Sequence, residues 1–225
     1  MKSSSRNSGF TIVELMISTA VFSMILLIVL GAVTQIGRMY YKGLSVSRTQ
    51  DASRRILDEI SQQIQFSPDL PGTTGGAGFS SATPVGLCIG TTRYIVQLNK
   101  QVAGSNNVAL NTQRHGLWLD DRGSATCNIS TGGFASNLQN DPPVTGVVEG
   151  RELLADGMRL VDLQLTNEGG ANPKLWTVRL RVVFGDQDLL DISNGVNQTV
   201  CSGSQVGTQF CAVSELSTTV LRRVR

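Results

Sequence analysis

The chain has 225 residues, of which 40% are hydrophobic and 16% are charged, so its composition excludes an intrinsically disordered polymer. Its formal net charge of +2 is too close to zero to indicate a nucleic-acid or acidic partner. One histidine and four widely spaced cysteines do not form the close pairs of a zinc site, so we expect no metal and no cofactor.

The first predicted element is an apolar helix. Residues 1–9 are small and polar, with Lys2 and Arg6 as the only charges, whereas Phe10 to Ile36 is almost wholly apolar. Leu15 to Gly37 carries no charge, and a helix of that length covers roughly 35 Å, enough to cross a bilayer core of about 30 Å. We therefore expect a membrane span. A secretory signal has a shorter apolar core than this, but a plain single-span anchor remains open.

Glu14 is the only charged residue in the apolar stretch. An acidic side chain in a span costs on the order of 3 kcal/mol, so something must offset that cost. One interpretation is that Glu14 snorkels to the membrane interface, because it lies near the start of the run. The other is that cleavage after Gly9 frees the amine of Phe10, which then pairs with the Glu14 carboxylate of its own chain or of a neighbour.

The run GFTIVELM, Gly9 to Met16, resembles the prepilin-type cleavage and methylation motif of type IV pilins and type II secretion pseudopilins. The resemblance implies that a prepilin peptidase cuts after Gly9 and methylates the new amine of Phe10. It also implies that Glu14 guides docking into a filament. Basic residues flank the span on both sides, so they do not determine its orientation: Lys2 and Arg6 precede it, and Arg38, Lys42 and Arg48 follow it. We expect a cytoplasmic N-terminus from the cysteines and the resemblance.

The helix is expected to continue beyond the membrane. Ile56, Ile60 and Ile64 recur every four residues and predict one apolar face, and Pro68 ends the pattern. A continuous helix from Phe10 to Gln65 is similar to the family's long helix, although Gly31, Gly37 and Gly43 leave two separate helices open. We expect a leader at 1–9, a helix at 10–66 that spans the membrane to about residue 36, and a globular head at 67–225.

The head is predicted to be mainly antiparallel β-structure packed on the helix, which makes the fold α+β. Alternation is clearest in Trp176 to Phe184, with one apolar and one polar face. Val161, Leu163 and Leu165 also alternate with polar residues. Other expected strands are Tyr94 to Leu98, Gly116 to Leu119 and Ser217 to Val224, with loops at 69–86, 120–145 and 193–210. The strand pattern resembles the larger minor pilins and J-type pseudopilins.

The four cysteines predict disulfide bonds in an oxidising compartment. We expect the pairs Cys88–Cys127 and Cys201–Cys211, although four cysteines allow three connectivities and reduced thiols remain an alternative. The second pair is the safer one because it closes a short polar loop, which would stabilise the fold by roughly 2–3 kcal/mol.

Other motifs carry little functional signal. The glycine-rich run at 76–81 lacks the flanking strand and helix of a nucleotide site, and His115 is expected at the surface. Asp120-Asp121 and the Asp186, Asp188 pair are more typical of solvated turns than of a calcium site. Two N-glycosylation sequons, at Asn128 and Asn197, carry little information about function. The basic residues Arg222, Arg223 and Arg225 are expected to be a solvated terminus rather than a DNA-binding tail.

These patterns predict a non-enzymatic minor pilin or pseudopilin, and the size of the head favours a minor subunit. By resemblance, its partners are the prepilin peptidase, other pilin or pseudopilin subunits, an inner-membrane assembly platform and the lipid bilayer. Its place would be the cytoplasmic membrane as a single-pass precursor and then an extracytoplasmic filament. Two rivals remain: an adhesin or DNA-uptake subunit, whose nucleic-acid partner nothing supports, and a single-span envelope protein of unknown activity.

Overall fold

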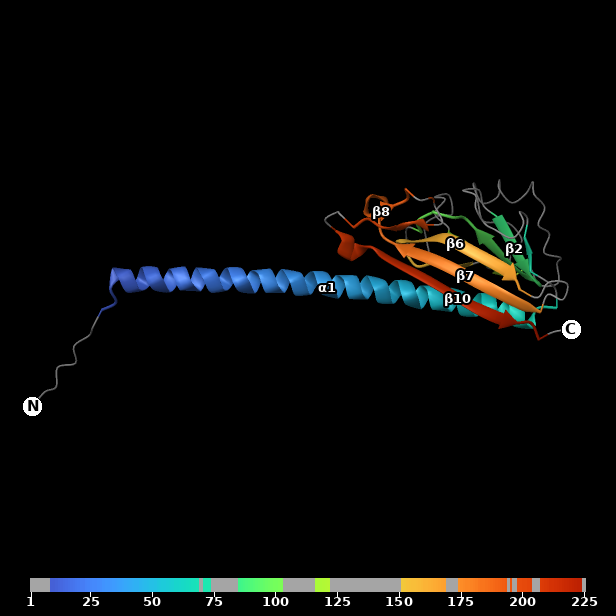
Figure 1. Ribbon diagram of the computed structural model, residues 1–225, viewed down its shortest axis with the longest axis horizontal. Coiled ribbons are helices and arrows are strands. Elements are labelled where there is room, and N and C mark those ends of the chain that lie inside the picture. Colours follow the sequence, from blue (N-terminus) through green and yellow to red (C-terminus); the bar gives the residue numbers. More distant parts are fainter. Residues whose placement is uncertain are drawn as a thin grey trace, which may run out of the picture. The chain divides into compact units, whose positions relative to one another are not determined.

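The computed structural model describes residues 9–68, 71–73, 85–102, 116–121, 151–168, 174–193, 195, 198–203 and 207–223. The chain divides into two compact units, Met1–Tyr41 and Lys42–Arg225, which we call the N-terminal and C-terminal units. One helix, α1 (Ile12–Phe66), runs without interruption through the boundary between them (Figure 1). The prediction of a continuous helix is confirmed, and the alternative of two helices is wrong.

The sequence of α1 explains where it begins and ends. It begins at Ile12, two residues after the predicted start, because Thr11 caps the first turn. It ends at Phe66, just before Pro68, whose ring cannot continue the hydrogen-bonded turn. The amide of Ser67 still donates to the carbonyl of Gln63 at 2.9 Å, which completes the last turn.

The first sheet contains five antiparallel strands in the order β1-β2-β3-β4-β5. Their bounds are β1 Gly72–Thr73, β2 Val85–Ile89, β3 Thr92–Val96, β4 Leu117–Asp121 and β5 Arg151–Glu152. The β2–β3 turn contains Gly90, whose φ of +60° suits glycine. A Cβ there would also stand 2.7 Å from the hydroxyl of Ser67, so the turn passes too close to the end of α1 for a side chain.

The second sheet has three antiparallel strands in the order β10-β7-β6. These are β6 (Met158–Asn167), β7 (Leu175–Phe184) and β10 (Ala212–Leu221), and β7 pairs with β10 over its whole length. A two-stranded sheet, β8 (Leu190–Asp191) and β9 (Val200–Cys201), and two short 3-10 helices, η1 (Gln187–Leu189) and η3 (Thr208–Phe210), complete the described elements. The α+β class with antiparallel pairing is therefore as predicted.

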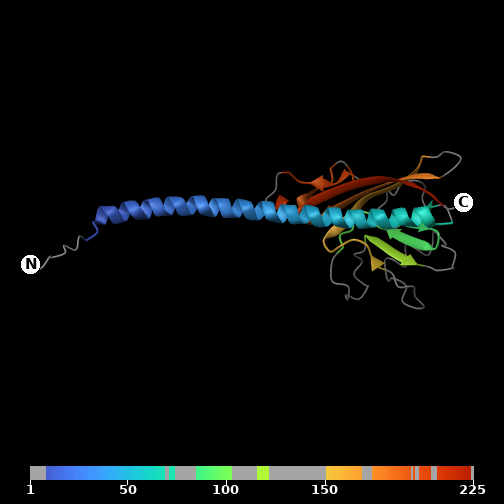
Figure 2. The same ribbon diagram turned by 90° about the horizontal axis from the view of Figure 1, so that it is seen from below.

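The core of the C-terminal unit joins the C-terminal half of α1 to both larger sheets. Ile60 and Ile64 are fully buried and Ile56 nearly so, which confirms the predicted apolar face. They pack in one cluster with Tyr94 of β3 and Leu180 of β7. Figure 2 shows β10 and the green strands β2 to β4 on opposite sides of this part of α1. Each buried isoleucine contributes about 1.5–3 kcal/mol, so this half of α1 is firmly held.

A β-bulge changes the predicted faces of β6. The pairing with β7 shifts between Leu160 and Asp162. Leu160 and Leu163 therefore both face the main core, although they are three residues apart. Val161 instead joins a second cluster with Val183, Leu189, Leu190 and Cys211. The prediction that Val161 shares a face with Leu163 was wrong, because simple alternation does not hold across a bulge.

Several strand boundaries also differ from those predicted. The strand expected at Tyr94 to Leu98 is Thr92–Val96, and the strand expected at Ser217 to Val224 is Ala212–Leu221. The loops expected at 69–86 and 193–210 contain β1, the start of β2 and β9. Asp120 and Asp121 end strand β4 rather than forming a turn. Two-residue strands and glycine-containing strands have too few side chains to produce a visible period.

Candidate functional site

The candidate site is the segment that leads into α1. Gly9 and Phe10 lie outside the helix, and the side chain of Phe10 is 82% exposed. A Cβ placed on Gly9 would meet no described atom within 4 Å. The packing of the chain therefore does not itself require glycine at this position. The peptide bond between the two residues is accessible and lies before the hydrogen-bonded turns of α1.

Thr11 and Glu14 form a reciprocal cap on the first turn of α1. The backbone N–H and the hydroxyl of Thr11 each donate to Oε2 of Glu14, both at 2.9 Å. The backbone N–H of Glu14 donates in return to the Thr11 hydroxyl at 3.2 Å. This is the Thr-x-x-Glu capping box, which satisfies backbone donors that a helix start leaves without partners. Sequence reasoning missed it, although the spacing from Thr11 to Glu14 was visible in the sequence.

The cap gives the Glu14 carboxylate a local partner inside an apolar stretch. The carboxylate also lies at the N-terminal end of the helix, where the macrodipole favours a negative charge. Among the described residues, every hydrogen bond to this carboxylate uses Oε2, and Oε1 accepts none. One oxygen is therefore held by the chain while the other is available to an external or newly formed donor.

The N-terminal unit presents apolar side chains along its helix. Those with large exposed fractions include Phe22, Leu27 and Ile36 at 62%, 71% and 66%. Polar groups in this stretch are satisfied internally: the hydroxyls of Ser18 and Ser23 donate to the carbonyls of Glu14 and Thr19. Such bonds are what an apolar environment requires. By length and composition, α1 is the one helix among the described residues that is able to cross a membrane.

Comparison with known families assigns this segment. Residues 4–30 match the family model described as the prokaryotic N-terminal methylation motif. The chain carries the type IV pilin and pseudopilin signal. The prepilin-type signal supports a type IV pilin-like or pseudopilin protein, a group of structural subunits rather than enzymes. No curated protein and no solved structure matches the chain.

The prepilin-type signal also indicates which kinds of partner the chain has and that it is anchored in a membrane. It implies processing by a prepilin peptidase and assembly with other pilin subunits. Together with the long apolar helix, it indicates a membrane-anchored, single-pass protein. Gly9, Phe10 and Glu14 all lie within the matched residues.

The cysteines lie far along the chain from the prepilin-type signal. Cys201 and Cys211 are bonded, with their Cα atoms 5.8 Å apart, which is the pair expected from the short polar loop. Cys88, in β2, is also disulfide-bonded. Cys127 lies outside the described residues, so the pair Cys88–Cys127 stays a prediction.

The motifs given little weight in the sequence have structural explanations where they are described. Asp186 accepts a hydrogen bond from Gln101 at 3.1 Å and lies near the buried Arg159. Within the described residues, no three His, Cys, Asp or Glu side chains converge as a metal site. His115, the glycine-rich run at 76–81 and the sequon at Asn128 lie outside the described residues. The asparagine of the second sequon, Asn197, does too.

Two of the basic residues near the end of the sequence, Arg222 and Arg223, contact the end of α1. Arg222 donates to the carbonyls of Ser67 and Pro68, and the guanidinium of Arg223 lies 6.0 Å from the Phe66 ring centre. These cations sit at the C-terminal end of α1, where the helix dipole favours positive charge. The expectation of a solvated terminus is therefore wrong for Arg222, which is partly buried, whereas Arg223 is exposed as expected.

Two carboxyl groups in the β10-β7-β6 sheet of the C-terminal unit have pKa values that differ from their ordinary values. Burial raises the pKa of Asp162, and a hydrogen bond from Gln164 partly offsets this. On the neighbouring strands, hydrogen bonds from Arg181 and Arg179 lower the pKa of Glu215. These carboxylates lie in one cross-strand row of the β10-β7-β6 sheet, since Arg181 pairs with both Asp162 and Glu215. The ion pairs of Glu215 with the two arginines stabilise the sheet, whereas burial of the Asp162 carboxylate costs stability.

Proposed function

We propose that this chain is a minor pilin or pseudopilin, a structural subunit of a type IV pilus or a type II secretion-like filament. The observation that carries the proposal is the prepilin-type signal at residues 4–30, which includes the first part of an exposed apolar helix. In this proposal Met1 to Gly9 is the leader, α1 is the anchor and assembly element, and the C-terminal unit is the part displayed on the filament.

Processing would begin at the bond between Gly9 and Phe10. The peptidase hydrolyses this exposed peptide bond, releases the leader and leaves a free amine on Phe10. Methylation of that amine keeps its positive charge at neutral pH. Because a Cβ on Gly9 would meet no described atom within 4 Å, the requirement for glycine would come from the peptidase.

Assembly would depend on Glu14. The new ammonium group of Phe10 lies one helical turn from a carboxylate that already has one oxygen bound to Thr11. The free oxygen can accept from the amine of the same chain or of a neighbouring subunit. In a water-poor helix bundle an unpaired charge is expensive, so this pair favours the docked state over a subunit alone in lipid.

The test is N-terminal peptide and intact mass spectrometry on the full chain extracted from membranes. It compares cells with and without an active prepilin peptidase. We expect a chain starting at N-methylated Phe10 only when the peptidase is present. A chain that starts at Met1 in both cells would overturn the proposal and favour the single-span envelope protein.

A further inference from the structure

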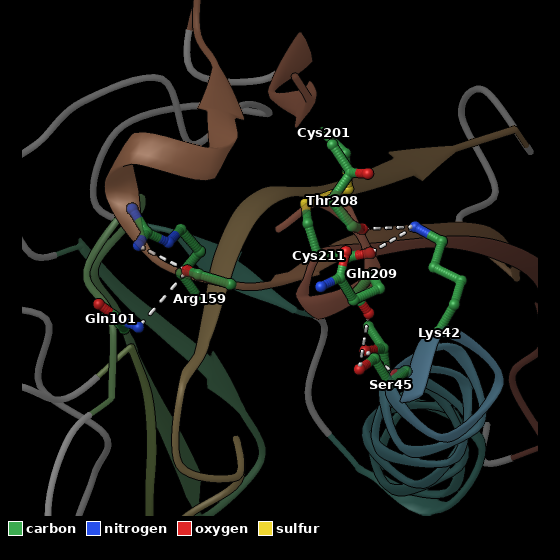
Figure 3. Close-up of a disulfide and its surroundings, with 10 residues drawn as sticks. Lys42, Ser45, Gln101, Arg159, Cys201, Thr208, Gln209 and Cys211 are labelled. Atoms are coloured by element: carbon green, nitrogen blue, oxygen red, sulfur yellow. Dashed lines mark hydrogen bonds between the residues drawn. A yellow bond between two sulfur atoms is a disulfide. The ribbon is translucent and has the colours of Figure 1, made fainter. Parts of the chain in front are cut away.

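The loop closed by the Cys201–Cys211 disulfide lies directly against α1 (Figure 3). The ammonium group of Lys42 donates to the carbonyl oxygens of Thr208, at 3.3 Å, and Cys211. The hydroxyl of Ser45 points at the carbonyl of Gln209, at 3.5 Å. Lys42 and Ser45 are three residues apart and therefore share one face of the helix. Three backbone carbonyls of the loop thus accept hydrogen bonds from one turn of α1.

The loop is fixed from its other side by the sheet. Cys211 is fully buried in the second cluster beside Val183. Gly185, with φ of +134°, passes so close that a Cβ on it would lie 3.3 Å from the Cα of Cys211. The carbonyl of Gly185 in turn accepts from the buried guanidinium of Arg159 at 3.0 Å. The carbonyls that bind Lys42 therefore stand on a rigid support.

The adjoining part of α1 buries few apolar side chains, although the partly buried Ala52 packs against the main cluster. Its buried residues between Lys42 and Ile56 are Ser45, Thr49 and Ser53. The hydroxyls of Thr49 and Ser53 bond to carbonyls of their own helix, at 2.7 and 2.8 Å, and not to the sheets. Large, fully buried apolar side chains begin only at Ile56. Because hydrophobic stabilisation scales with buried apolar area, polar contacts hold a larger share of this stretch than of residues 56–66.

We propose that the disulfide loop is a redox-sensitive latch that holds residues 42–53 of α1 on the C-terminal unit. In the oxidised state, the closed loop presents the Thr208 and Cys211 carbonyls to Lys42. A dithiol reduces the bond with two electrons and two protons, leaves two thiols and is itself oxidised to a disulfide. The opened loop gains conformational freedom. The carbonyls of Thr208 and Cys211 are then no longer held in position to accept hydrogen bonds from the Lys42 ammonium group. The latch concerns the C-terminal unit alone and does not depend on filament assembly.

Hydrogen exchange on the full-length protein in detergent tests the latch. The first variant carries Cys201→Ser and Cys211→Ser, which removes this disulfide and leaves the bond at Cys88. The second carries Lys42→Met, and the third combines all three changes. We expect amides in 42–53 to exchange about tenfold faster in each, because a charge-assisted contact is lost. Amides in 56–66 should not change, and the combined variant should add little. Arg54→Met, an exposed cation on the same helix, is the control.

A second measurement keeps the proposal testable if the serine variant does not fold. If the disulfide supports the Lys42 contact, the contact must support the disulfide by the same factor, because coupling is reciprocal. Lys42→Met should therefore raise the reduced-to-oxidised ratio of Cys201 and Cys211 in a dithiol buffer about tenfold, and Arg54→Met should not. An unchanged ratio, or equal acceleration of exchange throughout the C-terminal unit, would overturn the latch.

Discussion

Glu14 accepts two hydrogen bonds from Thr11, one from its backbone N–H and one from its hydroxyl, and both end on the same carboxylate oxygen. The residue that is expected to pair with the processed amine is therefore already part of the helix start. Under the proposed pairing, Glu14 links the local stability of the first turn to the chemistry of assembly. It also separates the two roles experimentally, because Thr11 can be changed without removing the charge.

Thr11→Ala should loosen the first turn while leaving the carboxylate in place. The alanine keeps its backbone N–H but loses the hydroxyl that accepts from Glu14 and donates to it. We expect the first amides of α1 to exchange about fivefold faster, the usual size of a lost cap. Hydrogen exchange in detergent measures this. Thr11→Ser, which retains the hydroxyl, should behave as the parent chain, and equal loss in both variants would contradict the cap.

Glu14→Ala should leave membrane insertion and leader removal intact but lower incorporation into filaments at least about tenfold, because the amine of Phe10 loses its partner in the bundle. Quantitative immunoblots of sheared filaments against membrane fractions provide the ratio. Asp58→Ala removes an exposed carboxylate from the C-terminal half of α1 and is the matched control. Normal incorporation of the Glu14 variant would remove the charge pair from the proposal.

Gly9→Val should block processing, because a branched side chain next to the scissile bond has no place in a pocket that accepts glycine. The folded chain should be unaffected, since no described atom lies within 4 Å of a Cβ at this position. Intact mass in cells with the peptidase should then show the full precursor. A mature chain starting at Phe10 in this variant would show that the peptidase does not require glycine at this position.

Ile60→Ala should destabilise the C-terminal unit by about 2–5 kcal/mol, the usual cost of emptying a fully packed site. Ile60 is completely buried between α1 and the sheets. Denaturant unfolding in detergent, followed by near-ultraviolet circular dichroism, measures the difference. Arg54→Ala, on an exposed face of the same helix, should stay within about 0.5 kcal/mol. Equal effects in the two variants would contradict the packing.

Glu215→Gln should lower stability in a pH-dependent way. Its folded pKa lies below the ordinary 4.5 because Arg181 and Arg179 bind the carboxylate. The stabilisation is therefore complete above the unfolded pKa and is lost as pH falls through the folded one. Melting temperatures of parent and variant should differ at pH 7 and converge well below pH 4. Glu168→Gln, at an exposed carboxylate, is the comparison; a constant offset at every pH would contradict the ion pairs.

The sequence predicted the elements whose periodicity is long and uninterrupted. Ile56, Ile60 and Ile64 marked the buried face of α1, and Trp176 to Phe184 marked β7, because repeated apolar side chains reveal which face is buried. Val161 was assigned to the wrong face, since the bulge before Asp162 leaves no trace in the alternation. Gly9 and Phe10 were recognisable as a motif, and their roles still await the peptide measurement.

Contacts between distant segments were not predictable in the same way. Nothing about Lys42 distinguishes it from Arg48 in the sequence, yet Lys42 binds two carbonyls of the disulfide loop. Arg222 likewise looked like part of a solvated tail before its contacts with Ser67 and Pro68 were known. Such bonds depend on the path of the chain through three dimensions, which local patterns do not encode. The capping box is different, because Thr11 and Glu14 are neighbours and the signal was overlooked.

The arginine contacts at the end of α1 have a consequence for biogenesis. Strand β10 lies along the whole of β7, and Arg222 then reaches back 155 positions to the residue after the helix. Neither contact exists until residues 212–223 have left the ribosome. Contacts this distant in sequence form late in folding. The C-terminal unit therefore cannot close around α1 until strand β10 and Arg222 have been made, so its N-terminal helix waits for its last described strand.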